Sequence, residues 1–120
     1  MIHWQRDTDR GNLTSEMSKL SAAIDGIIIK HNLPFQFFEG WRCQERQDEL
    51  VALGVSWTAH SKHMKGKAGD WVAKINGEWT WKPNRLYRAF GNLVKHYLGK
   101  QIIWGGDWKR RDYCHFELPD

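Results

Sequence analysis

Two short stretches of the chain carry histidine and aspartate residues that could hold a metal ion. In the first, His63 precedes Asp70 by seven positions, and in the second, Asp112 precedes His115 by three. Imidazole nitrogen and carboxylate oxygen are both ligands of zinc. Two histidines and two aspartates could therefore supply the ligands of one zinc ion and a further carboxylate that acts as a base.

The spacing of the first pair argues against a shared helix. Residues seven apart on a helix are separated by about 10.5 Å along its axis, whereas zinc ligands lie about 2.0 to 2.2 Å from the ion. Gly66 and Gly69 lie between His63 and Asp70 and permit the positive φ angles of a tight loop. We therefore expect residues 61–70 to form a loop whose two ends meet at the metal.

The second pair lies at the start of a predicted short strand. Alternation along this strand places His115 and Glu117 on one face, and the apolar Phe116 on the other. A strand is a rigid element, so it can hold a ligand in a fixed place. We expect His115 to be the third ligand.

These ligands would leave zinc one open position. With His63, Asp70 and His115 bound, water can occupy the fourth site, as in catalytic zinc centres. Zinc lowers the pKa of such a water to about 7. Asp112 could then take the proton as the water attacks a carbonyl and return it to the leaving amine, which is amide hydrolysis. The spacing alone is weak evidence, because such residues lie on the surface in most proteins.

The two motifs resemble those of a known family of zinc peptidases. The pattern Ser-x-His-x-x-Gly-x-Ala-x-Asp occupies residues 61–70, and Asp-x-x-His-Phe-Glu occupies residues 112–117. Together they resemble the family of D-Ala-D-Ala carboxypeptidases and phage L-alanyl-D-glutamate endopeptidases, which act on peptidoglycan stem peptides. The resemblance therefore implies a zinc enzyme that acts on the bacterial cell wall.

The resemblance also assigns roles to residues. It implies that His63, Asp70 and His115 bind zinc, and that Asp112 is the catalytic base. Members that cut D-Ala-D-Ala usually carry Glu at the base position, whereas endolysin-type endopeptidases carry Asp, as this chain does. The residue before the last ligand is commonly Pro or Trp, and here it is Cys114. The expected reaction is hydrolysis of the L-Ala–D-Glu bond, with D,D- or L,D-carboxypeptidase activity as the alternative.

The resemblance extends upstream to a Gly-aromatic-Arg segment within residues 39–47. It implies that Arg42 holds a substrate carboxylate or the developing oxyanion, a role that suits a planar guanidinium. Ser61 would similarly contact the substrate. Without the family, Arg42 could instead be a surface arginine paired with Glu39 or Glu45, since exposed ion pairs are common.

Length and composition limit the domain organisation and the partners. At 120 residues the chain suits one domain, residues 1–120, without a separate wall-binding module. A net charge of +4 and a pI near 9.2 favour an anionic partner. A nucleic-acid-binding domain is therefore the alternative from another class, although a peptidase is expected to bind stem peptides and no nucleic acid. Cys43 and Cys114 could pair, but free thiols are favoured, and we expect a monomer.

The sequence also predicts where the enzyme acts. No apolar run follows the first residues, which argues against a secretory signal peptide. No stretch of about eighteen apolar residues marks a membrane span. We expect synthesis in the cytoplasm of a host cell and action at the cell wall after release by a holin, as for an endolysin that lyses its host.

Periodicity and turn signals predict an α+β domain with about three helices around a mostly antiparallel sheet. Helices are expected from Thr14 to before Leu33, over residues 44–53, and from Pro83 to Gly99. Strands are expected over residues 35–39, 70–75, 78–81, 101–104 and 114–118, with Asn76 and Gly77 as a hairpin turn. The resemblance implies the same class, the fold of the D,D-peptidases and hedgehog proteins.

Overall fold

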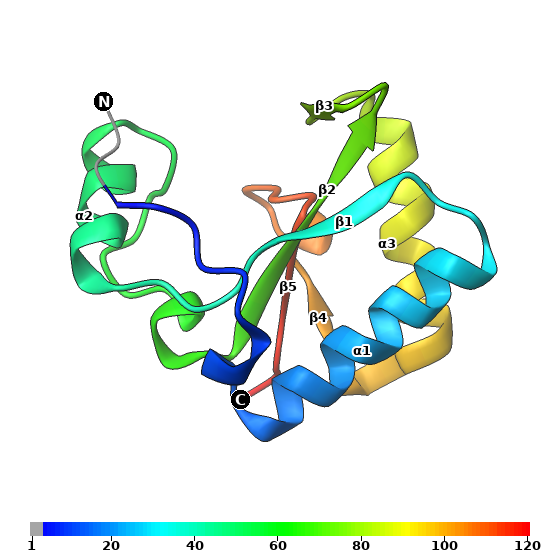
Figure 1. Cartoon of the computed structure of the whole chain (residues 1–120), viewed down its shortest axis with the longest axis horizontal. Helices are drawn as coiled ribbons and strands as arrows, with labels where there is room; N and C mark the ends of the chain where they lie inside the picture. Colours follow the sequence, from blue (N-terminus) through cyan, green and yellow to red (C-terminus); the bar gives the residue numbers. More distant parts are fainter. Residues whose placement is uncertain (1–3) are drawn as a thin grey trace.

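The computed structural model describes residues 4–120, which form an antiparallel sheet with helices packed on it (Figure 1). The α-helices of this part are α1 (Ser15–Lys30), α2 (Gln44–Ala52) and α3 (Asn84–Leu98). The strands are β1 (Phe35–Glu39), β2 (Ala68–Ile75), β3 (Glu78–Thr80), β4 (Ile103–Trp104) and β5 (His115–Glu117). The 3-10 turns are η1 (Arg10–Asn12), η2 (Lys62–Lys65), η3 (Gly99–Gln101) and η4 (Gly105–Asp107).

The register of the sheet brings three ionisable residues into one row. The strand order is β1-β2-β5-β4, and β3 pairs with the far end of β2 as a hairpin. Glu39 of β1 pairs with Asp70 of β2, and Asp70 pairs with His115 of β5. A register shift between Phe37 and Glu39 marks a bulge in β1. Side chains that are far apart in the sequence therefore lie side by side at one end of the central strand.

Apolar side chains fill the space between the sheet and the two long helices. Figure 1 shows α1 and α3 on the same side of the sheet, while α2 lies apart at the other end of the molecule. The largest fully buried apolar side chains are Trp71, Tyr87, Phe90, Phe116, Met17 and Ile24. Phe35 stacks on Phe90 with 4.1 Å between ring centroids, and Phe90 meets Phe116 edge-on at 5.5 Å. These aromatic contacts fix β1 and β5 against α3.

Most helix boundaries agree with the predictions. Thr14 caps α1 by accepting a hydrogen bond from the Met17 amide at 3.2 Å. α3 follows Pro83, and Gly99 ends it with a positive φ of 55°. None of the helices within residues 4–120 combines the length and the apolar character that a membrane span requires. The α+β class with an antiparallel sheet is confirmed.

Four strands differ from their predicted bounds, and two of them only by one residue at an end: β3 ends at Thr80 instead of residue 81, and β5 spans His115–Glu117 instead of residues 114–118. The strand expected over residues 101–104 is limited to Ile103–Trp104, because the chain turns through η3, which begins at Gly99 and ends at Gln101. The strand expected to begin at Asp70 begins at Ala68, which pairs with Glu117. β2 therefore reaches further into the predicted metal loop, which makes Asp70 an internal strand residue.

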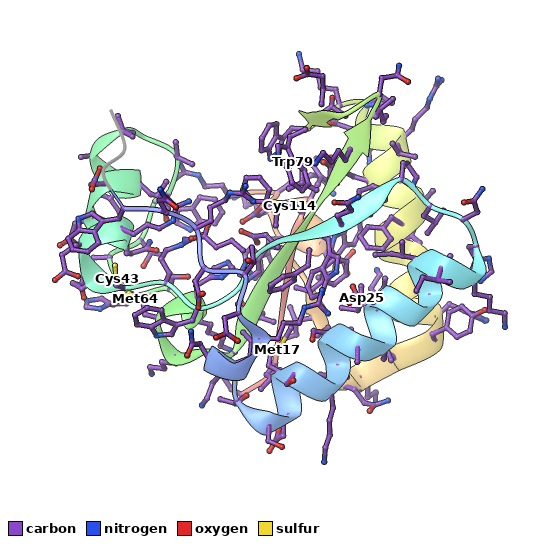
Figure 2. The ribbon with its side chains drawn as sticks, viewed as in Figure 1. Met17, Asp25, Cys43, Met64, Trp79 and Cys114 are labelled. Carbon is purple, nitrogen blue, oxygen red and sulfur yellow. The ribbon has the colours of Figure 1, made fainter. Side chains whose placement is uncertain are left out.

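The two cysteines are both free thiols. Figure 2 shows Cys43 beside α2 and Cys114 near the middle of the molecule. Cys114 comes directly before β5, and its Sγ lies 3.4 Å from Oδ1 of Asp112. Burial raises the pKa of the Cys114 thiol well above its usual value, and the negative charges of Asp70 and Asp112 raise it further.

Candidate metal centre

The three predicted ligands converge in the structure. One donor atom each from His63, Asp70 and His115 lies within 4.8 Å of the other two. Oδ1 of Asp70 is 3.2 Å from Nε2 of His63 and 3.3 Å from Nδ1 of His115. All three residues are buried, with 2%, 8% and 5% of their surface exposed. The donor set of two imidazole nitrogens and one carboxylate oxygen suits zinc.

The loop that carries His63 is held by a cap and by a glycine. Ser61 accepts a hydrogen bond from the His63 amide at 3.1 Å and so caps η2. Gly66 ends this turn with φ of 68°, in the left-handed region that favours glycine. A Cβ at Gly66 would lie 2.7 Å from the carbonyl oxygen of Asn12, so no side chain fits there. The predicted loop is thus a short 3-10 turn closed by glycine.

Each predicted ligand also has a protein partner outside the set of three. Nδ1 of His63 lies 2.7 Å from the carbonyl oxygen of Gly40. Oδ2 of Asp70 lies 3.5 Å from the guanidinium of Arg42. Nε2 of His115 lies 2.8 Å from Oε1 of Glu117. Such outer partners fix the tautomer and orientation of metal ligands, which leaves Nε2 of His63 and Nδ1 of His115 facing the site.

The three predicted ligands are also coupled by charge. Burial alone would raise the pKa of Asp70, but the charge of His63 and hydrogen bonds from both histidines hold it well below its usual range. Burial alone would lower the pKa of His115, but its hydrogen bonds to Asp70 and Glu117 raise it to about 9. The site without metal therefore holds an ionised carboxylate beside a protonated imidazole.

Asp112 lies at the edge of the same cluster, as the sequence predicted. Its Oδ2 is 4.0 Å from Nδ1 of His115, and its side chain is 33% exposed. Burial raises the pKa of Asp112, and the nearby charge of Asp70 raises it further. The Asp112 amide donates to the carbonyl of Gly105 at 3.0 Å, and a Cβ at Gly105 would lie 2.4 Å from the Asp112 carbonyl oxygen. Gly105 is thus the residue that lets this loop approach the site.

Arg42 is buried and anchored beside the ligands. Its guanidinium donates to both carboxylate oxygens of Glu39, at 3.1 and 2.8 Å, and to Oε1 of Gln47 at 2.9 Å. The surface ion pair considered from the sequence is therefore partly correct, because the partner is Glu39 but only 8% of Arg42 is exposed. The substrate-binding role implied for Arg42 stays a prediction.

A cavity of about 750 Å³ opens over the cluster. Its lining includes the ligands, Asp112, Arg42 and Ser61, so all six predicted site residues border one space. Trp57, Trp81 and Trp108 also line it, and the Trp108 ring lies 5.1 Å from the His115 ring. The cavity is within the range of small-molecule and peptide sites.

Four residues that support the site were not predicted as site residues. Glu39 and Gln47 hold Arg42, Glu117 holds His115, and Lys62 holds Glu117 at 2.9 Å. Glu39 and Gln47 lie within the upstream segment of the resemblance, and Glu117 lies within the second motif. The position of these three residues within the motifs is the feature of the sequence that could have identified them as site residues.

Comparisons with known proteins identify the family of this chain. The sequence profile of a family described as phage L-alanyl-D-glutamate peptidase matches residues 7–118. The crystal structure of the Serratia marcescens L-Ala D-Glu endopeptidase ChiX is 32% identical, with a TM-score of 0.70, over 98% of this chain and 92% of that one. No curated protein sequence gives a significant match.

A more distant solved structure shares the fold. It is the E175A mutant of the vancomycin resistance D,D-pentapeptidase VanY, from a VanB-type cassette, in complex with Zn(II). The two chains are 14% identical with a TM-score of 0.63, over 98% of this chain and 79% of that one. At this identity the likeness concerns the fold alone.

Proposed function

Since this chain belongs to the phage L-alanyl-D-glutamate peptidase family and is a peptidoglycan endopeptidase, we propose that it cuts the L-Ala–D-Glu bond of stem peptides at a zinc ion held by His63, Asp70 and His115. The observation that carries the zinc assignment is the convergence of donor atoms from three buried residues that line one cavity. Two imidazoles and one carboxylate are a ligand set that leaves a fourth position on zinc for the reaction. When bound, zinc acidifies a coordinated water and polarises a carbonyl.

Asp112 is the proposed proton carrier. It borders the cavity beside His115, and its raised pKa suits a carboxylate that must hold a proton between two transfers. It would take the proton from the attacking water and give it to the departing amine of D-Glu. In the overall reaction the amide C–N bond would break, the water oxygen would become part of the new carboxylate, and both protons of the water would end on the departing amine.

Arg42 and Ser61 are the proposed substrate-binding residues. Both border the cavity, and Arg42 brings a positive charge next to Asp70. Negative charge develops on the carbonyl oxygen during amide hydrolysis, and a fixed guanidinium stabilises such charge. The buried pairing with Glu39 holds this guanidinium in place before the substrate arrives.

Digestion of purified muropeptides tests the bond that is cut. We expect fragments with a new amino terminus on D-Glu, identified by mass spectrometry, and no such fragments after treatment with a chelator. Addition of zinc to the chelated protein should restore them. Release of free D-alanine instead would identify a carboxypeptidase and would contradict the proposed bond.

Metal analysis of a ligand variant tests the site itself. We expect His63→Ala to lose zinc, because two remaining ligands hold the ion far less tightly. A matched control is His31→Ala, since His31 is exposed and forms a hydrogen bond with Tyr97 outside the site. A His63→Ala protein that keeps one equivalent of zinc would refute the ligand assignment.

The proposed biological role is lysis of a bacterial host. The phage family supports an enzyme made inside the infected cell that reaches the wall after a holin opens the membrane. We expect expression alone to leave cultures intact and co-expression with a holin to cause rapid clearing, followed as turbidity. We also expect a monomer in size-exclusion chromatography.

A further inference from the structure

A chain of contacts runs from the side of the His115 ring that faces away from the metal site to a lysine on another segment. Nε2 of His115 lies 2.8 Å from Oε1 of Glu117, and Oε2 of the same carboxylate lies 2.9 Å from Nζ of Lys62. His115 and Glu117 are two apart on β5, so they share one face of the sheet. The carboxylate therefore bridges an imidazole and an ammonium group.

The imidazole needs this acceptor in order to face the metal correctly. Nδ1 of His115 is the nitrogen that points at Asp70, at 3.3 Å, so Nδ1 must carry the lone pair when a metal binds. The ring proton must then be on Nε2. The carboxylate of Glu117 accepts a hydrogen bond from this N–H group. A carboxylate in this position also makes the imidazole a stronger metal ligand.

Lys62 connects the two segments that carry histidine ligands. It directly precedes His63 in η2, and its ammonium group donates to the carbonyl oxygen of Leu118 at 2.6 Å as well as contacting Glu117. Its side chain is 23% exposed and that of Glu117 is 13% exposed, so water screens this pair only in part. One ammonium group thus ties the turn of the first ligand to the strand of the third.

We propose that Glu117 and Lys62 form a positioning pair for the metal site: Glu117 fixes the tautomer and orientation of His115, and Lys62 fixes the carboxylate of Glu117. This proposal rests on the proposed zinc site. Neither residue is a proposed ligand of the metal, so the pair acts on the metal through His115. In this proposal Lys62 acts on the metal through Glu117, so the loss of zinc affinity on removing both residues should equal the loss on removing Glu117 alone.

Zinc affinity, measured by competition with a chromogenic chelator, tests the pair without relying on activity. We expect Glu117→Gln to bind zinc about 10- to 100-fold more weakly, because outer partners of metal ligands have effects of that size. Lys62→Met should show a smaller loss. The matched control is Lys65→Met, which removes the same charge from an exposed position of the same turn and should bind zinc within about twofold of the unaltered protein.

The double variant tests the order of the contacts. Lys62→Met with Glu117→Gln should bind zinc no more weakly than Glu117→Gln alone, because effects of residues in one network are not additive. Separate multiplicative losses would overturn the role of Lys62. Unchanged zinc affinity in folded Glu117→Gln, with folding checked by thermal unfolding of the metal-free proteins, would overturn the whole proposal.

A spectroscopic signature separates positioning from a general structural role. Long-range proton–nitrogen NMR spectra of the zinc-loaded protein should show His115 protonated at Nε2, and Glu117→Ala should broaden or shift that signal while leaving His31 unchanged. An identical His115 signal would count against the pair. Failure of the unaltered protein to bind zinc would instead refute the proposed function, so the two failures are distinguishable.

Discussion

The two faces of the sheet at β2 and β5 are built from neighbouring residues with opposite chemistry. Trp71 and Phe116 point to the helices, where their rings meet at 5.7 Å, while Asp70 and His115 point to the cavity. The helix-facing side is stabilised by apolar area and close packing. The cavity-facing side holds buried charged groups that depend on specific partners.

This difference separates stability from chemistry along the same strands. A change on the helix-facing side alters volume, which affects the free energy of unfolding. A change on the cavity-facing side alters a charge or a hydrogen bond, which affects metal binding and proton transfer. Substitutions on each face can therefore test whether the two properties are as separate as the structure indicates.

The largest expected effect is on catalysis, from Asp112→Asn. The amide keeps the size of the side chain but cannot take a proton, so the hydrolysis rate should fall by about 10²- to 10⁴-fold. Zinc content and the unfolding temperature should stay unchanged, because Asp112 is not a proposed ligand and is partly exposed. The measurements are muropeptide digestion, metal analysis and thermal unfolding. Undiminished hydrolysis would remove Asp112 from the mechanism.

The matching change is Phe90→Ala, on α3 where this helix packs against the helix-facing side of the sheet. Phe90 is 1% exposed and contacts both Phe35 and Phe116, so its loss should lower the free energy of unfolding by about 3–5 kcal/mol. Zinc affinity of the folded protein, measured well below the unfolding temperature, should stay near that of the unaltered protein. A large loss of zinc affinity without unfolding would show that the two faces are coupled through β5.

A substitution at Gly66 should affect both stability and zinc binding, because this residue connects the turn of His63 to the start of α1. Gly66 ends the turn of His63, and its carbonyl accepts a hydrogen bond from the Thr14 amide at the start of α1. Gly66→Ala would place a Cβ 2.7 Å from the Asn12 carbonyl at a positive φ. We expect a loss of about 1–3 kcal/mol in the free energy of unfolding together with weaker zinc binding.

Gly77→Ala is the control for this prediction. Gly77 also has a positive φ, of 80°, but a Cβ there meets no atom within 4 Å. It lies in the hairpin between β2 and β3, away from the ligands, so it should lower stability without changing zinc affinity. Equal effects of the two substitutions on zinc binding would contradict the special role of Gly66.

The sequence predicts the ligands better than their support. The two motifs and their family resemblance single out His63, Asp70 and His115 as the proposed ligands, and the structure brings their donor atoms together. The helices can also be predicted from the sequence, because their caps and apolar periodicity are local signals. Thr14, which caps α1, is an example. The strand wrongly expected to begin at Gln101 failed because the conformation of Gly99 diverts the chain into a 3-10 turn.

The support of the ligands depends on contacts between distant segments. Glu117 meets Lys62 across 55 positions of sequence, and no local pattern encodes that pairing. Arg42 shows the same difficulty, because its pairing with Glu39 is local but its burial depends on how α2 and β1 pack. Spacing can therefore place residues at a site, whereas the hydrogen bonds that tune them require the packed structure.

Per pH unit, the smallest expected effect is the pH dependence of zinc binding, which should be confined to the cavity-facing side. His115 has a pKa of about 9 in the metal-free protein, so it is protonated at pH 7 and must lose its proton to bind zinc. The apparent affinity should therefore rise about tenfold per pH unit between pH 7 and 9, with about one proton released per zinc, measured by calorimetry in buffers of different ionisation enthalpy. The same raised pKa stabilises the metal-free fold below about pH 6.5, and this contribution is lost as the pH rises through 9. The destabilisation caused by Phe90→Ala should not vary over this range, because no ionisable group is removed. A zinc affinity that is constant from pH 7 to 9 would contradict the protonated state of His115 and, with it, the charge coupling that distinguishes this face.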